Sequence, residues 1–72
     1  MDKIRRADIQ IGKRTYLEIL RIFPTVTKAK DNLGCSKNVI YSWASGTAPS
    51  AKHLQAMAVM GMDVVYILTG KR

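Results

Sequence analysis

The amino-acid sequence predicts an all-α protein, a compact bundle of about five short helices. Two observations lead to this prediction. Apolar residues recur at helical spacing along most of the chain, and residues that start or stop helices interrupt the pattern. A length of 72 residues allows one small domain. The hydrophobic core of such a domain is only marginally sufficient for stability without disulfides, a bound metal or oligomerisation. We therefore expect efficient helix packing, aided by dimerisation.

The first twelve residues fit three different structures. Ile4, Ala7 and Ile11 recur at helical spacing, whereas the residues from Ile9 to Ile11 alternate like a short strand. The segment is therefore an additional helical turn, a strand used in dimer pairing, or a basic arm. We treat residues 1–12 as an N-terminal basic segment or arm, followed by the folded domain, residues 13–70.

The pattern becomes clearer from Lys13 onward. Tyr16, Leu20 and Phe23 lie at i, i+4 and i+7, which predicts an amphipathic helix. Pro24 should end this helix, because a proline pushes the residue before it out of the helical region.

Residues 25–46 predict two short helices joined at Gly34. The hydroxyl of Thr25 can cap the first helix, and Gly34 can adopt the left-handed conformation that ends it. Ser36 can cap the second helix, which Gly46 stops. Two helices joined by so short a turn are typical of a helix-turn-helix, whose second helix enters the DNA major groove.

Two further helices are expected near the C-terminus. Ser50 is a suitable N-cap for a helix that runs to about Met60. Asp63 can cap a short final helix over residues 64–68, closed by Gly70.

Charge narrows the classes of partner. Lys and Arg number 12 against 5 acids, and the net charge is +7, with the basic residues concentrated before Asn38. Such an excess suits nucleic acid or an anionic membrane surface, or it merely aids solubility. No apolar run approaches the roughly 20 residues needed to span a bilayer, and no signal-peptide pattern is present. We expect a cytoplasmic protein without a membrane partner.

The sequence offers little for catalysis. It lacks a clustered nucleophile and base and paired carboxylates at useful spacing, so we do not expect an enzyme. The single Cys35 and the single His53 form no metal-ligand set, and no metal or cofactor is expected. Cys35 is a small core residue or, alternatively, a redox sensor. We expect His53 to face solvent, and Trp43 to lie in the core rather than stack on a base.

Two blocks of sequence carry a family resemblance. LGCSKNVIYSW, at residues 33–43, places Ile40 and Trp43 on one helical face. PSAKHLQAMAVMGMDVVYILTG, at residues 49–70, combines a Pro-Ser helix start, a glycine, an Asp-capped apolar turn and a closing Leu-Thr-Gly. Over about residues 13–70 the chain resembles the phage-repressor branch of the lambda-repressor-like helix-turn-helix domains (XRE/Cro/CI superfamily).

One position departs from the family pattern. The family usually has an alanine four residues before the hinge glycine, where the two helices approach closely, and this chain has Lys30 there. Either the stem of Lys30 snorkels outward, or Ala29 takes the close approach through a small rotation of the helix.

The outer side of the second hinge helix supplies the expected base contacts. Lys37 can donate to guanine O6 and N7, and Asn38 can pair bidentately with adenine N6 and N7. Val39 contacts a thymine methyl group or packs in the core. The full set of expected base contacts is Lys37, Asn38, Val39, Tyr41 and Ser42.

Phosphate contacts are expected at helix starts and in the loop after the recognition helix. The expected residues are Thr25, Thr27, Lys28, Ser36, Ser45 and Thr47. Lys3, Arg5 and Arg6 either add contacts from the arm or form a solvated run of charge.

The resemblance implies a sequence-specific transcription regulator that binds double-stranded DNA. It implies a phage or prophage repressor or a Cro-like protein, acting as a homodimer on a palindromic operator. Similar repressors pair through the final helix, so the expected interface is Met62, Val64, Val65, Tyr66 and Ile67. The alternative is an antitoxin-type autoregulator that also binds a toxin protein through its apolar C-terminal face. Similar proteins often continue into a second domain, so the chain is either complete or the N-terminal domain of a longer repressor.

Overall fold

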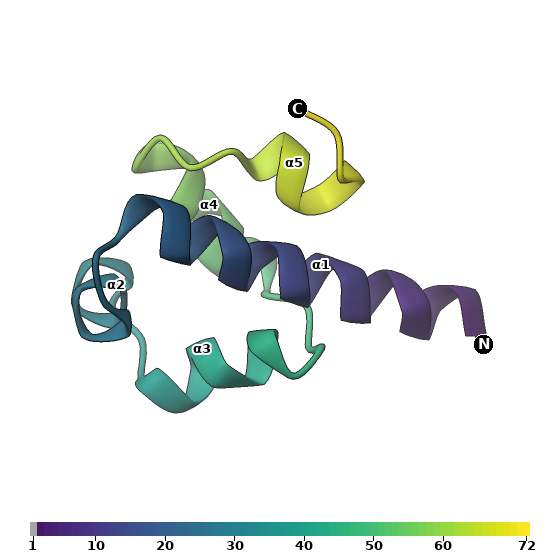
Figure 1. Ribbon diagram of the computed structural model, residues 1–72, viewed down its shortest axis with the longest axis horizontal. Helices are drawn as coiled ribbons and strands as arrows, with labels where there is room; N and C mark the ends of the chain where they lie inside the picture. The colour runs from purple at the N-terminus through teal and green to yellow at the C-terminus, as the bar shows by residue number, and fades with distance from the viewer. Residues whose placement is uncertain (1) are drawn as a thin grey trace.

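The computed structural model describes the backbone of residues 2–72 and the side chains of residues 6–72, and it is all-helical over that range. The five helices are α1 (Asp2–Ile22), α2 (Val26–Leu33), α3 (Lys37–Ala44), α4 (Ala51–Val59) and α5 (Val64–Thr69) (Figure 1). The prediction of an all-α bundle with five helices is confirmed at this level.

Helix α1 organises the molecule. With 21 residues it extends about 31 Å at 1.5 Å per residue, close to the longest dimension of the domain, 34 Å. In Figure 1 it runs horizontally, with α3 below it and α5 above it, and its first turns extend beyond the other helices. Helix α3 packs on both α1 and α2, and α5 packs on α1 and α4.

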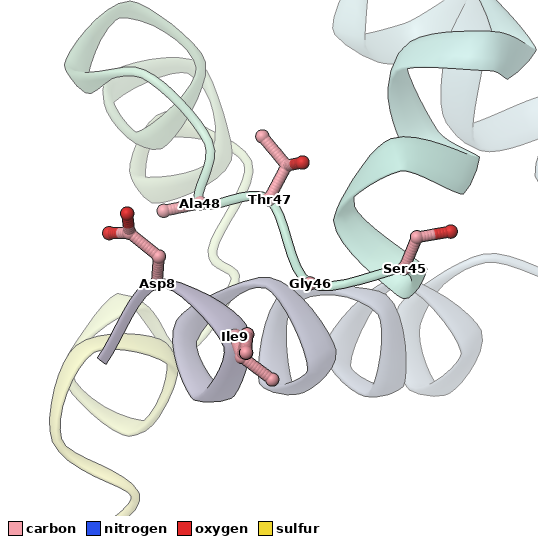
Figure 2. A pocket seen from close by; sticks show the side chains of 6 residues that line it. All are labelled: Asp8, Ile9, Ser45, Gly46, Thr47 and Ala48. Atoms are coloured by element: carbon pink, nitrogen blue, oxygen red, sulfur yellow. The ribbon is translucent and has the colours of Figure 1, made fainter. Parts of the chain in front are cut away.

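Helix α1 continues N-terminally beyond Lys13, the residue from which the amphipathic pattern was clear. The helix begins at Asp2, so residues 2–12 are helical, which was one of the three interpretations of this segment. The strand-like alternation of Ile9 and Ile11 has a helical explanation. Two residues i and i+2 lie on different flanks of a helix. Ile11 packs against the core, and Ile9 lies against the loop after α3, where an added Cβ on Gly46 would be 3.1 Å from Ile9 Cγ1 (Figure 2).

Gly12 allows α1 and the end of α3 to touch through their backbones. A Cβ at this position would lie 2.6 Å from the carbonyl oxygen of Trp43 and 2.5 Å from that of Thr47. Because both neighbours are backbone atoms, neither can move aside independently of α3. Glycine is therefore required here for close approach rather than for an unusual backbone angle.

All five helices contribute to the core. Its buried apolar residues are Ile19, Ala29, Leu33, Ile40, Trp43, Met57, Met62 and Ile67. Partly buried side chains surround this cluster, among them Tyr16, Phe23, Val26, Cys35 and Leu54.

The helix ends follow the signals in the sequence. Helix α1 ends at Ile22, just before Phe23 and Pro24. The side chain of Ser36 accepts a hydrogen bond from Val39 N at 3.3 Å, and that of Asp63 accepts one from Tyr66 N at 2.9 Å. Thr25 and Ser50 cap α2 and α4 in the same way. These interactions satisfy backbone N–H groups that have no partner within their own helix.

The turn between α2 and α3 is built around Gly34. Its φ of 70° and ψ of 35° lie in the left-handed region, and its N–H donates to the carbonyl of Lys30 at 2.9 Å. Ala29 is fully buried, whereas Lys30 is only half-buried and its Nζ lies 2.7 Å from the carboxylate of Asp31. Both interpretations of the departure at Lys30 are met in part: Ala29 is buried, and the half-buried Lys30 keeps its ammonium beside the exposed Asp31.

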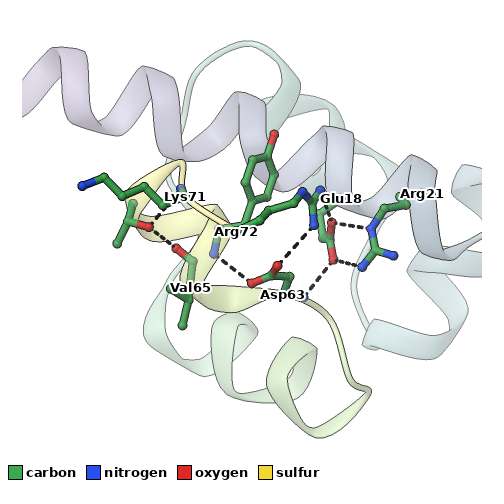
Figure 3. A network of polar contacts seen from close by, with 8 residues as sticks. Glu18, Arg21, Asp63, Val65, Lys71 and Arg72 are labelled. Carbon is green, nitrogen blue, oxygen red and sulfur yellow. Dashed lines mark hydrogen bonds and ion pairs between the residues drawn. The ribbon is translucent and has the colours of Figure 1, made fainter.

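Helix α5 is held to α1 by polar contacts that the sequence did not reveal. The buried carboxylate of Glu18 pairs with Arg21, accepts the N–H of Asp63 at 2.8 Å and lies 3.3 Å from Arg72 (Figure 3). The hydrogen bond from Arg21 Nε is 2.9 Å long. Arg14 donates to the carbonyls at the end of α5, with Nε 2.9 Å from the oxygen of Ile67. Together these contacts fix both ends of a helix of six residues, which is too short to be stable alone.

Candidate nucleic-acid interface

The helix pair α2–α3 presents one side of α3 to solvent. Ile40 is fully buried and Trp43 is 2% exposed, so these two residues anchor α3 in the core. Asn38 and Tyr41 lie on the outer side of α3 and Lys37 is its first residue; all three are exposed, Tyr41 by 47%. The arrangement brings a lysine, an amide and a phenol together on one accessible helix face.

Two of the expected base-contact residues have other roles in the structure. Val39 is half-buried and packs against the core, which is the second of the two roles considered for it. Ser42 is half-buried and its hydroxyl donates to the carbonyl of Val39 at 2.5 Å. Lys37, Asn38 and Tyr41 are therefore the side chains of this set that are free to reach a partner.

Lysines dominate the surface around the start of α3. Asp31 is the acid among them, and its pKa is lowered, first by its hydrogen bond with Lys30 and also by the charges of Lys28 and Lys37. Since three lysines influence one exposed carboxylate, the local charge is positive. Such a surface favours an anionic partner.

The expected phosphate-contact residues lie in two groups. Thr25, Thr27 and Lys28 are exposed at the start of α2, where Thr25 Oγ1 already accepts the N–H of Lys28 at 3.1 Å. Ser45 and Thr47 are exposed in the loop after α3, and the hydroxyl of Ser45 donates to Tyr41 O at 3.1 Å. Ser36, also exposed, uses its hydroxyl oxygen to cap α3.

Asp8 is a residue of this surface that sequence reasoning missed. It lines an open hollow of about 430 Å³ together with Ile9 and the loop of residues 45–48 (Figure 2). The carboxylate thus shares a hollow with Ser45 and Thr47, two expected phosphate contacts. Residue 8 is far from this loop in the sequence, and only the N-terminal extension of α1 brings the two together.

Of the three basic residues expected to act as an arm, the structure describes the side chain of one. The side chains of Lys3 and Arg5 lie outside the described residues, whereas Arg6 is exposed on α1. Tyr16 of α1 lies beside Tyr41 of α3, with 6.5 Å between the ring centroids. Helix α1 therefore borders the exposed face of α3.

The expected dimer interface is wrong for two of its five residues. Ile67 is fully buried and Met62 is 5% exposed, so both belong to the core of a single chain and have no surface for a partner. Val65 is 66% exposed, and Leu68, outside the expected set, is 46% exposed. Val64 and Tyr66 are half-buried, and Tyr66 is covered by the guanidinium of Arg72, 4.0 Å from its ring centroid. Only the outward side of α5 is accessible.

Three residues considered for redox sensing, base stacking or solvent exposure are instead part of the packing of the domain: Cys35, Trp43 and His53. Cys35 is half-buried, and burial raises the pKa of its thiol, which disfavours the thiolate that a redox sensor needs. Trp43 has almost no exposed surface on which a base could stack. The expectation for His53 is wrong: it is half-buried, with its ring edge-on to Trp43 at 5.4 Å between centroids. Its Nδ1 lies 2.9 Å from Ser50 Oγ.

Two further observations concern membranes and metals. Among the described helices, none has both the length and the apolar character required to cross a membrane. Within the described residues, no group of three or more His, Cys, Asp or Glu side chains is arranged to hold a metal ion.

Comparison of the chain with protein-family models, with curated proteins and with solved structures gives no match.

Proposed function

We propose that this protein is a sequence-specific transcription regulator of the lambda-repressor-like type that binds double-stranded DNA. The observation that carries the proposal is the capped pair α2–α3 around a left-handed Gly34, with Lys37 and Asn38 exposed in the first turn of α3. A helix held in this way by its buried side can enter the major groove with its N-terminal residues against the bases.

The chemistry of the exposed side chains suits base recognition. Asn38 offers a donor and an acceptor to the N7 and N6 of adenine, and Lys37 offers donors to guanine. The hydroxyls and N–H groups at the start of α2 suit a phosphate, which positions the protein without specifying sequence. A net charge of +7 strengthens binding to any DNA and makes it salt-dependent. Repression follows when the bound protein occludes the polymerase.

A dimer fits the proposal because one short helix reads only a few base pairs. A two-fold axis would place two α3 helices about 34 Å apart on one face of a palindromic operator. The exposed Val65 and Leu68 on α5 supply an apolar patch for this contact. The same patch is compatible with an antitoxin-type autoregulator whose partner is a toxin, and a chain that is monomeric by itself favours this second candidate.

The first experiment measures specificity. A random duplex pool is enriched on the protein, and the affinity for the enriched sequence is compared with that for a scrambled duplex at one salt concentration. We expect the enriched duplex to bind at least about 10³-fold more tightly. Equal affinity for every duplex would show that the protein is not a sequence-specific regulator.

A pair of matched variants then tests the role of α3. Asn38→Ala removes an exposed amide from α3, and Gln55→Ala removes an exposed amide from α4. We expect Asn38→Ala to weaken binding to the enriched duplex by about 1–3 kcal/mol and to leave scrambled DNA nearly unaffected. Gln55→Ala should alter neither affinity. A parallel loss on both duplexes for Asn38→Ala would contradict the assignment of α3 as the recognition helix.

A further inference from the structure

The solvent side of α1 carries a regular row of side chains. They follow an alternating spacing of four and three residues, and all of them are exposed: Arg6, Gln10, Lys13, Leu17 and Leu20. We refer to these five residues as the α1 seam. This spacing keeps side chains on one face of a helix and is the spacing by which two helices pack along each other.

The two ends of the α1 seam differ in character. Leu17 is 56% exposed and Leu20 is 49% exposed, although the opposite face of α1 already supplies buried residues, including Ile19, to the core. These two leucines are therefore not required by the fold of this chain. The other end of the α1 seam is basic, with Arg6 and Lys13 one on each side of Gln10.

The acids of α1 that the structure describes do not belong to the α1 seam. Glu18 is fully buried and pairs with Arg21. Asp8 lies in the hollow beside the loop of residues 45–48. The seam consequently has an apolar half and a positive half, with no described carboxylate among its members.

We propose that the α1 seam binds an amphipathic helix of another protein, one that is apolar opposite Leu17 and Leu20 and acidic opposite Arg6 and Lys13. Charge selects this occupant. A second copy packed parallel would place Arg6 and Lys13 against their own counterparts, and one packed antiparallel would place Lys13 against Lys13 and Arg6 against Leu20, so neither arrangement supplies a negative partner. A nucleic acid would leave the leucines against phosphates. An acidic amphipathic helix satisfies both halves of the seam.

This inference goes beyond DNA binding and does not depend on it. None of the seam residues belongs to α2 or α3. The test therefore contains no DNA, so that a failure of the proposed regulator function and a failure of this inference give separate results.

The probe is a fluorescein-labelled synthetic helical peptide with leucines at alternating three- and four-residue spacing and flanking glutamates. Its binding to the full chain is followed by fluorescence anisotropy at low salt. We expect the double variant Leu17→Gln/Leu20→Gln to weaken binding about ten-fold or more, and Lys13→Glu to weaken it similarly. Val59→Gln is the matched control, since Val59 is 82% exposed on α4, and it should bind like the parent protein.

A second peptide, with lysines in place of the glutamates, should not bind. Circular dichroism checks that each variant remains helical, which we expect because the substituted side chains are largely exposed. The inference is overturned if the acidic peptide does not bind or binds all variants equally. It is also overturned if Leu17→Gln/Leu20→Gln halves the sedimenting mass, because a second copy would then occupy the seam. Binding of phosphatidylglycerol vesicles in place of the peptide would identify the seam as a lipid-binding surface and would equally overturn it.

Discussion

At Gly12 the backbone of α1 lies against the carbonyl oxygens of Trp43 and Thr47, and a Cβ would come within 2.5 Å of the latter. In an open helix position, replacing glycine with alanine would stabilise the protein by roughly 0.5–1 kcal/mol. Here we expect Gly12→Ala to lower the free energy of unfolding by about 2–3 kcal/mol, because α1 and the end of α3 must separate. Urea unfolding followed by Trp43 fluorescence measures the change. Gln10→Ala, an exposed change on the same helix, serves as the control. A Gly12→Ala variant as stable as the parent would contradict the close approach.

Among the described side chains, the carboxylate of Glu18 is the acid whose pKa is lowered most strongly. Its hydrogen bonds with Arg21 lower its pKa from 4.5 to about 2, assisted by the N–H of Asp63 and by Arg72. A folded-state pKa below the unfolded value means that the stabilisation is complete above about pH 4.5 and is lost as the pH falls towards 2. We expect a loss of about 2–3 kcal/mol over this range, reduced by the half-exposure of both arginines.

The measurement compares the parent protein with Glu18→Gln, by urea unfolding at several pH values from 7 down to 2. The difference in stability between the two proteins should be largest at neutral pH and should shrink below about pH 4.5. Taking the difference removes the contribution of the other acids, including Asp31. A difference that stays constant with pH would show that the negative charge of Glu18 does not contribute to the stability of the folded protein.

At the scale of the element, the turn between α2 and α3 depends on backbone angle alone. A Cβ on Gly34 would meet no atom within 4 Å, but its φ is +70°. We expect Gly34→Ala to cost about 1–2 kcal/mol, and Gly34→Asn to cost less, because asparagine tolerates the left-handed region better than other residues. Thermal unfolding of both variants measures the difference. Equal costs for the two substitutions would indicate that something other than the backbone angle limits this position.

The helices that the sequence predicted well are those with local signals. A capping side chain, a following glycine or a proline acts within a few residues, so the boundaries near Pro24, Gly34 and Ser36 could be predicted from neighbours alone. The start of α1 could not, because this part of the helix packs against the end of α3 and the loop that follows it, which are distant in the sequence. For the same reason the crowding at Gly12 and the position of Asp8 beside that loop were not apparent.

The candidate site was predictable to the extent that helical spacing separates inner from outer residues. This logic correctly separated Ile40 and Trp43 from the exposed Lys37, Asn38 and Tyr41. It failed on the final helix, where nearly every residue is apolar and spacing gives no contrast. Burial of Met62 and Ile67 in the core depends on how α5 is fastened to α1 by Glu18, Arg14 and Arg72, and these contacts join distant parts of the chain.

At the scale of the whole molecule, the fastening of α5 leaves Val65 and Leu68 directed away from the core, exposed by 66% and 46%. If the proposed dimer forms through this surface, the double change Val65→Gln/Leu68→Gln should convert dimer to monomer without altering net charge. Analytical ultracentrifugation measures the mass, and circular dichroism checks the fold. Val59→Gln, at another exposed valine, should leave the dimer intact.

Because a monomer holds only half of a palindromic operator, the monomeric variant should also lose most of its affinity for the enriched duplex and retain its affinity for scrambled DNA. A parent protein that sediments as a monomer, or a double variant that remains dimeric, would place the association surface elsewhere than on α5.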